Sequence, residues 1–279
     1  MCHHKMSINF NRNRTQVSFE HFVGITSIEE LRTKKQDFKA HCLTDDEVRQ
    51  LQIDIRQDAV DFFYNGILSF SEGIDSVFQK RFSWATVKLY YSIYYLLRAS
   101  FAAKGITILR CTSMYRLKIK TGEKPYATGN RKYNTNHEGT INHYKDMYSF
   151  SDRLLSNKID DIDVYEWMMR AREIVNYRSV SFLEPSCLDI WEFYSNCIDD
   201  NSLAEELENL EADDYIRCFQ EEFAVVAIPI KRLQQTISDM ANAGLLGQLT
   251  LDRESFARSV LDYDRRSLSI LSDIFGHTT

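Results

Sequence analysis

The fold is decided by residues 82–106, FSWATVKLYYSIYYLLRASFAAKGI, which are apolar around nearly the whole circumference of a helix. A helix of this composition lies in the centre of a bundle or beneath a partner subunit, because no side of it favours water. Gly105 stands where a glycine commonly ends a helix. We therefore predict a central helix over this stretch.

The central helix carries four tyrosines: Tyr90, Tyr91, Tyr94 and Tyr95. Aromatic side chains at helical spacing usually belong to a core or an interface, and we interpret these four in that way. A platform on which nucleic-acid bases stack is the alternative.

A long amphipathic helix is predicted before the central one. Thr44, followed by Asp45, Asp46 and Glu47, is a helix start signal, because a hydroxyl cap and acidic residues suit the free N–H groups of a first turn. From Val48 to Ile74, apolar residues recur at three- and four-residue steps. The chain has only 10 Gly and 3 Pro, too few for the turns of a sandwich, barrel or Rossmann-type fold. The sequence predicts an all-α protein.

The composition of the chain indicates a folded, acidic protein. With 44% hydrophobic and 27% charged residues, the chain can build a core and is not predominantly disordered. The net charge of −6 means that binding to a nucleic acid must rest on a local patch. Six cysteines without a CxxC pair indicate free thiols in a cytoplasmic protein. We expect no signal peptide, no membrane span, no cofactor and no metal.

Residues 107–150 interrupt the helical pattern and predict a small β-hairpin or ordered loop inserted in the bundle. Residues 115–120 alternate between apolar and cationic side chains, as a strand does, and residues 121–125 (TGEKP) read as a turn. Between Arg110 and Lys132 there are seven cations and one anion, a local charge of +6.

This charge makes the insertion a candidate RNA-binding surface. The cations expected to contact phosphates are Arg116, Lys118, Lys120, Arg131 and Lys132. Such contacts give affinity with little sequence preference, and the interleaved tyrosines suit single-stranded RNA. His137 and His143 follow, and we interpret them as exposed loop histidines, with a catalytic base as the alternative.

The second half of the chain is also predicted to be helical. Residues 163–180 form a third amphipathic helix, and further helices are expected near 214–243 and 252–275. Residues 196–214 hold eight acidic side chains and no basic one, which is typical of a solvated face or linker. We divide the chain into an N-terminal segment (1–43), a bundle with its insertion (44–200) and a helical C-terminal extension (201–279).

Two of these helices resemble those of the HEPN superfamily (higher eukaryotes and prokaryotes nucleotide-binding). YYSIYYLLRASFAAKGI (90–106) resembles the tyrosine- and alanine-rich second helix of many members. MMRAREIVNYR (168–178) resembles the helix on which the family places an arginine, four to six residues and then a histidine. The resemblance covers roughly residues 45–185, with 107–150 as an insertion.

The resemblance implies a HEPN-like helical bundle from a bacterial anti-phage or toxin-type system that binds or cleaves RNA. It implies a metal-independent endoribonuclease acting at a homodimer interface, and a protein partner from the same operon. In such members an imidazole moves the proton of the ribose 2′-hydroxyl, and a guanidinium stabilises the charge that develops on the phosphate.

This sequence departs from the family pattern because Asn176 and Tyr177 stand where the histidine is expected. The candidate catalytic residues are Arg170, Arg172, Asn176, Tyr177 and Arg178. In a regular α-helix Arg170 and Tyr177 would lie about 20° apart around the axis. A solvated helix face, on which the arginines pair with Glu166 and Glu173, is the alternative.

Two other functions are left open by the sequence. The chain can be a catalytically inactive helical subunit that docks onto and regulates a nuclease, ATPase or toxin partner, as its apolar central helix and acidic stretch 199–214 favour. A metal-dependent hydrolase is a weaker alternative, based on the carboxylates of Asp160, Asp161, Asp163, Asp199 and Asp200.

Overall fold

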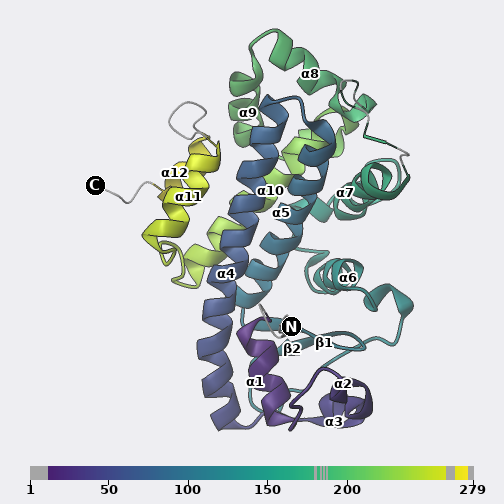
Figure 1. Ribbon diagram of the computed structural model, residues 1–279, viewed down its shortest axis with the longest axis vertical. Coiled ribbons are helices and arrows are strands. Elements are labelled where there is room, and N and C mark those ends of the chain that lie inside the picture. Colours follow the sequence, from purple (N-terminus) through teal and green to yellow (C-terminus); the bar gives the residue numbers. More distant parts are fainter. Residues whose placement is uncertain are drawn as a thin grey trace, which may run out of the picture.

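The computed structural model describes residues 12–178, 181, 182, 184, 186, 188–261 and 268–275. This part of the chain is helical apart from one two-stranded antiparallel sheet, so the predicted all-α fold with a small β-hairpin is confirmed (Figure 1). The helices are α1 (Arg14–Phe22), α2 (Glu30–Thr33), α3 (Lys35–Ala40), α4 (Asp45–Phe78), α5 (Phe82–Ala103), α6 (Asn136–Tyr148), α7 (Val164–Glu173), α8 (Glu192–Asp199), α9 (Leu203–Ala212), α10 (Glu221–Asn242), α11 (Leu251–Leu261) and α12 (Ser269–Phe275). The strands are β1 (Ile106–Cys111) and β2 (Ser113–Lys118).

The helices α4 and α5 run side by side along the molecule (Figure 1). Thr44 and Glu47 form the predicted start of α4 as a reciprocal capping box. Gly66 and Gly73 allow α5 to come close, because a Cβ atom at these positions would lie 2.7 Å from Leu96 and 2.8 Å from Leu89. The close approach lets Ser92 of α5 donate a hydrogen bond to the Gly66 carbonyl, at 2.9 Å.

One hydrophobic cluster extends from Ile55 in α4 to Ile274 in α12. It includes Leu96 of α5 and Val225 of α10, so the C-terminal helices share a core with the central pair. Four of the eight acidic residues of this stretch lie in α9, whose leucines, Leu207 among them, are buried; Glu205 and Glu208 are exposed, whereas Glu206 and Glu211 are half-buried. The interpretation as a solvated face therefore describes Glu205 and Glu208, whereas Glu206 pairs with Arg217 and Glu211 accepts a hydrogen bond from the Ile270 N–H group.

A second hydrophobic cluster joins the N-terminal segment to the hairpin. Phe19 of α1 and Phe38 of α3 pack against Leu109, Tyr115 and Leu117 of the strands. Ile108 and Met114, on the opposite face of the hairpin, belong to the first cluster. The hairpin is thus buried between two cores.

The hairpin turn lies at Thr112 and not at residues 121–125. The sequence pattern does not identify β1, because this strand is buried on both faces and lacks the alternation that identifies residues 115–120 as a strand. The segment after β2 does turn back, and Tyr126 pairs with Arg116 in an isolated bridge.

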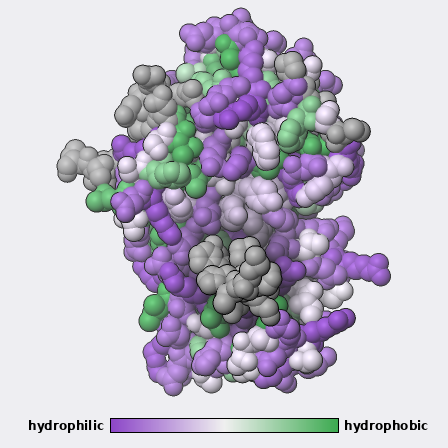
Figure 2. All heavy atoms as spheres, in the orientation of Figure 1, coloured by the Kyte–Doolittle hydropathy of each residue, from purple (hydrophilic) through white to green (hydrophobic). Residues whose placement is uncertain are grey.

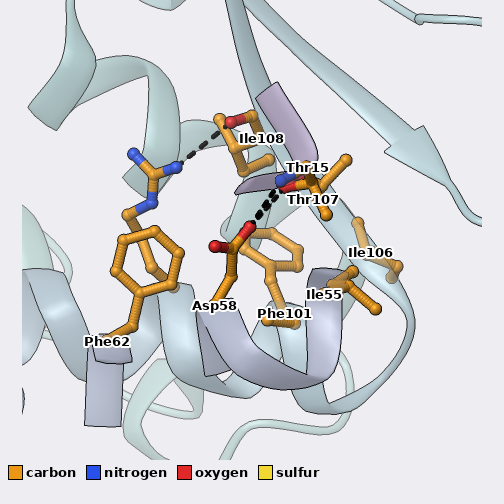
Figure 3. Close-up of a pocket in the computed structure, with 10 residues that line it drawn as sticks. Thr15, Ile55, Asp58, Phe62, Phe101, Ile106, Thr107 and Ile108 are labelled. Carbon is orange, nitrogen blue, oxygen red and sulfur yellow. Dashed lines mark hydrogen bonds between the residues drawn. The ribbon is translucent and has the colours of Figure 1, made fainter. Parts of the chain in front are cut away.

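Asp58 of α4 fixes the start of α1. Its carboxylate accepts hydrogen bonds from the Thr15 backbone N–H group at 2.9 Å and from the Thr15 hydroxyl (Figure 3). It also accepts one from the backbone N–H group of Arg14, at 2.7 Å. Burial raises the pKa of Asp58. The adjacent cavity has about 10 Å³, room for roughly one water molecule, so it is no ligand site.

A buried arginine ties α10 to the rest of the bundle. Arg232, with an exposed fraction of 0%, donates hydrogen bonds to Tyr144 of α6 at 2.6 Å and to Ser100 of α5 at 3.0 Å. Its guanidinium lies 3.5 Å from the carboxylate of Asp152 and 3.6 Å from that of Asp239. No helix in the described ranges is long and apolar enough to cross a membrane.

We predict that Arg232→Met destabilises the protein by about 3–5 kcal/mol, because it leaves the buried Asp152 carboxylate without its cation. Arg49→Met is the control, since Arg49 forms an exposed ion pair with Asp46 and its loss should cost less than about 1 kcal/mol. Urea unfolding of both variants measures the difference. Equal losses would contradict a structural role for Arg232.

Candidate functional site

The helix α7 directs one of the three candidate arginines towards α5. Asp163 caps the helix by accepting hydrogen bonds from the N–H groups of Tyr165 and Glu166, both at 3.1 Å. Arg172, with an exposed fraction of 7%, lies over the ring of Tyr90, with 4.8 Å between the guanidinium carbon and the ring centroid. Burial of a guanidinium against an aromatic face is a favourable cation–π arrangement.

The chain continues from α7 as a π-helical segment, Ile174–Arg178. In a π-helix the hydrogen bonds join residues five apart, and Arg172 and Tyr177 have this separation. Their guanidinium carbon and ring centroid lie 5.6 Å apart. The expected pairing of Arg170 with Tyr177, which assumed α-helical geometry, is replaced by the pairing of Arg172 with Tyr177.

The other candidate catalytic residues lie outside this contact. Arg170 is exposed and forms an ion pair with Glu166 at 2.6 Å. Arg178 is exposed, 3.9 Å from Glu173. Asn176 is half-buried. The solvated-face alternative therefore describes Arg170 and Arg178 but not Arg172.

His137 in the first turn of α6 packs against the tyrosines of α5. Its ring centroid lies 4.3 Å from that of Tyr94 and 5.3 Å from that of Tyr91. Its Nδ1 atom is buried and has no hydrogen-bond partner among the described residues. Burial, followed by the positive charges of Arg172 and Arg98, lowers the pKa of His137 to about 4.

We define the tyrosine–arginine cluster by the residues that meet here: Tyr90, Tyr91, Tyr94, His137, Arg172 and Tyr177. Burial raises the pKa of Tyr90, an effect that Arg172 partly opposes, so this phenol stays protonated at neutral pH. His137, in contrast, is neutral at this pH and can accept a proton. The cluster thus combines a neutral imidazole with a fixed guanidinium.

The interpretation of His137 and His143 as exposed loop residues is wrong. Both lie on α6, in a region where no helix was expected. His143 has an exposed fraction of 0%, and its Nε2 atom lies 3.3 Å from the Met114 carbonyl oxygen. His143 is a structural residue, whereas His137 faces the cluster.

The five candidate RNA-binding cations lie on or near the hairpin. Lys118, Lys120, Arg131 and Lys132 are exposed, and Arg116 is half-buried with its guanidinium carbon 4.8 Å from the ring centroid of Tyr126. None of the five forms an ion pair with another described residue, so their charges are available to an anion. We call this surface the cationic face. Figure 2 shows hydrophilic side chains projecting from the end of the molecule that contains the hairpin and α6.

One residue of the cationic face, Lys132, lies close to the tyrosine–arginine cluster along the chain. Lys132 is five residues before His137, so their Cα atoms lie within about 18 Å of each other. The side chain of Asn142 donates a hydrogen bond to the Lys132 carbonyl at 2.9 Å, and Tyr133 donates one to Asp146 at 2.8 Å. These contacts hold Lys132 on α6, the helix that carries His137.

No protein-family model, curated protein or solved structure matches this chain. The resemblance to HEPN proteins therefore stays a prediction. Among the residues that the structure describes, no three His, Cys, Asp or Glu side chains gather as metal ligands would. Asp163, one of the carboxylates considered for a metal, caps α7 and pairs with Lys145.

We predict that Arg172→Met raises the pKa of His137 above 4 but leaves it below 6.5, because burial, the larger cause of its depression, remains. NMR titration of the imidazole measures this, with His137→Gln to assign the signal and Arg170→Met as the control. Since the folded pKa lies below the ordinary value, the unfolded chain takes up the proton first. His137 therefore reduces the folding stability as the pH falls from about 6.5 towards 4. The same pKa in the protein and in Arg172→Met would show that Arg172 does not act on His137.

Proposed function

We propose that the protein binds single-stranded RNA along the cationic face and cleaves its backbone, without a metal ion, at the tyrosine–arginine cluster. The observation that carries the binding proposal is the group of five cations with no acidic partner in the described chain. Phosphates bind such groups by releasing counterions, whatever the base sequence. The exposed Tyr126 and Tyr177 offer rings on which unpaired bases can stack.

The cleavage step uses the two polar groups of the cluster. His137 accepts the proton of a ribose 2′-hydroxyl, the 2′ oxygen bonds to phosphorus, and the bond from phosphorus to the 5′ oxygen breaks. The leaving 5′ oxygen takes a proton from water, and His137 gives its proton back to water, so that the products are a 2′,3′-cyclic phosphate and a 5′-hydroxyl end. Arg172 stabilises the negative charge that develops on the phosphate oxygens.

The low pKa of His137 is compatible with this role. In the free protein it keeps the imidazole neutral, and part of the depression comes from Arg172. A phosphate bound beside Arg172 offsets that positive charge and makes His137 a stronger base. Tyr177, with an exposed fraction of 74%, lies against Arg172 and provides a stacking surface for a flanking base.

The second candidate function is that of a catalytically inactive subunit which docks onto a protein partner. An exposed aromatic pair favours it: Trp84 and Phe182 are 48% and 50% exposed, with ring centroids 5.4 Å apart. Exposed aromatic side chains that contact each other are common in protein interfaces. The two functions differ in their outcome for RNA, which an inactive subunit leaves intact.

We predict that the triple variant Arg116→Gln, Lys118→Gln, Lys120→Gln binds RNA more weakly than the parent and with a flatter salt dependence. Each phosphate contact contributes about 0.7 to the slope of log K against log salt for a single strand, so three lost contacts reduce the slope by about 2. Fluorescence anisotropy with a labelled oligonucleotide measures it. The control removes three paired cations, Arg49, Lys80 and Arg81. If both triple variants have the parent's slope, the cationic face does not bind RNA.

We predict that His137→Gln lowers the rate of RNA cleavage by about 10²–10⁴-fold, because the general base is lost while the phosphate contacts remain. Arg172→Met should lower it as well, and Arg170→Met should not, since Arg170 is paired with Glu166 outside the cluster. Gel analysis of cleavage in the presence of a chelator measures all three. Binding without cleavage by the parent protein would overturn the catalytic proposal and favour the inactive subunit.

A further inference from the structure

A groove of about 410 Å³ opens between α3, the hairpin turn and the segment before α6. The polar residues that line it are Lys35, Lys39, Thr112, Ser113, Thr128 and Asn134. Neither lysine was singled out from the sequence, because both lie in the N-terminal segment, far along the chain from the cationic insertion. The fold brings the N-terminal segment and the insertion together by packing α3 on the hairpin.

The charge of this lysine groove is entirely positive. Lys35 and Lys39 are four residues apart on α3, so they share one side of the helix. Neither forms an ion pair in the described part of the chain, and no acidic residue lines the groove. Asp37 lies about 200° around the helix from Lys35. Two like charges at this spacing repel each other, and an anion bound between them would remove the repulsion.

Hydroxyl groups complete the lining of the groove. Thr112, Ser113 and Thr128 each offer an O–H donor, and the Asn134 amide offers N–H donors. Thr112 has a φ of +63°, a conformation that β-branched residues rarely adopt. Such strain is concentrated at functional sites, and here it belongs to the residue that turns the chain from β1 to β2 at the edge of the groove.

These donors suit a phosphate better than a base. Tyr115 is the aromatic residue of the lining, and at 1% exposure its ring offers no face for stacking. A phosphate monoester has three acceptor oxygens and nearly two negative charges, which match two ammonium groups and several hydroxyls. The volume lies in the range of small-molecule sites, about 300–1,000 Å³, so the groove also has room for a sugar attached to the phosphate.

We infer that the lysine groove binds the terminal phosphate of a nucleotide, carried either by a free nucleoside monophosphate or by the 5′ end of an RNA strand. Binding of an RNA 5′ end rests on the proposed RNA-binding function, whereas binding of a free nucleoside monophosphate is independent of it.

The test compares ligands that differ only in this phosphate. Calorimetry with the full chain at low salt measures the binding of adenosine monophosphate and of adenosine. Anisotropy measures one short RNA with a 5′-phosphate or a 5′-hydroxyl end. The variant is Lys35→Gln with Lys39→Gln, which removes two cations that have no acidic partner. The control is Lys158→Gln, an exposed lysine outside the groove, and circular dichroism confirms that both variants fold.

We expect the parent to bind adenosine monophosphate at least tenfold more tightly than adenosine, and the double variant to lose at least tenfold of that affinity. If the parent prefers 5′-phosphorylated RNA and the double variant does not, the 5′ end of RNA is a ligand of the groove. If the parent binds adenosine monophosphate but shows no preference for 5′-phosphorylated RNA, the ligand is the free nucleotide. Equal binding of the monophosphate by parent and double variant would overturn the inference.

The outcome also separates this inference from the proposed function. If RNA with a 5′-hydroxyl end binds through the cationic face, but the affinity for adenosine monophosphate does not depend on Lys35 and Lys39, the inference about the lysine groove is wrong and the proposed RNA interface is supported. If adenosine monophosphate binds through the two lysines but RNA does not bind, the inference about the lysine groove is supported and the proposed RNA interface is wrong.

Discussion

The structure depends on one constraint: α5 is apolar around nearly its whole circumference, so most of its surface must be covered. The helix α4 covers one side at the close contacts of Gly66 and Gly73, and α10, α6 and α7 pack around the rest. The cover is thinner along one line of the helix, where Trp84 is 48% exposed and Lys88, Tyr91, Tyr95 and Arg98 are half-buried. The tyrosine–arginine cluster forms beside this line, where α6 and α7 approach the same stretch of α5.

Patterns in the sequence predicted those elements whose fold is set by local physics. The capping residues of α4, the buried tyrosines Tyr90 and Tyr94 and the acidic outer side of α9 follow from spacing and composition alone. The candidate site was harder to predict, because its geometry depends on a change of helix type. Two residues five apart, Arg172 and Tyr177, meet only because the chain becomes π-helical after Glu173, and no local rule indicated that change.

His137 shows a second limit of sequence patterns. The segment 107–150 is predicted from its sequence to be a hairpin or ordered loop, yet residues 136–148 form α6, although Asn136, Gly139 and Thr140 lower helix propensity. Tertiary packing requires the glycine, since a Cβ atom at position 139 would lie 2.9 Å from the Tyr133 carbonyl oxygen and 2.7 Å from the side chain of Met114. A residue that weakens the helix in isolation therefore allows it to dock on the hairpin and to bring His137 to α5.

The distribution of charge determines what kind of partner the cationic face can attract. The whole chain has a net charge of −6 and residues 110–132 have +6, so the remainder carries −12. A polyanion is repelled by most of this surface and attracted at one end, which orients it during approach. Salt weakens both effects, but in the proposed RNA complex the local phosphate contacts would set the slope of log K against log salt, because they release counterions. In the proposed complex a protein of acidic composition binds RNA through a small region, in which Arg116 and Lys118 are placed by a hairpin that packs between two cores.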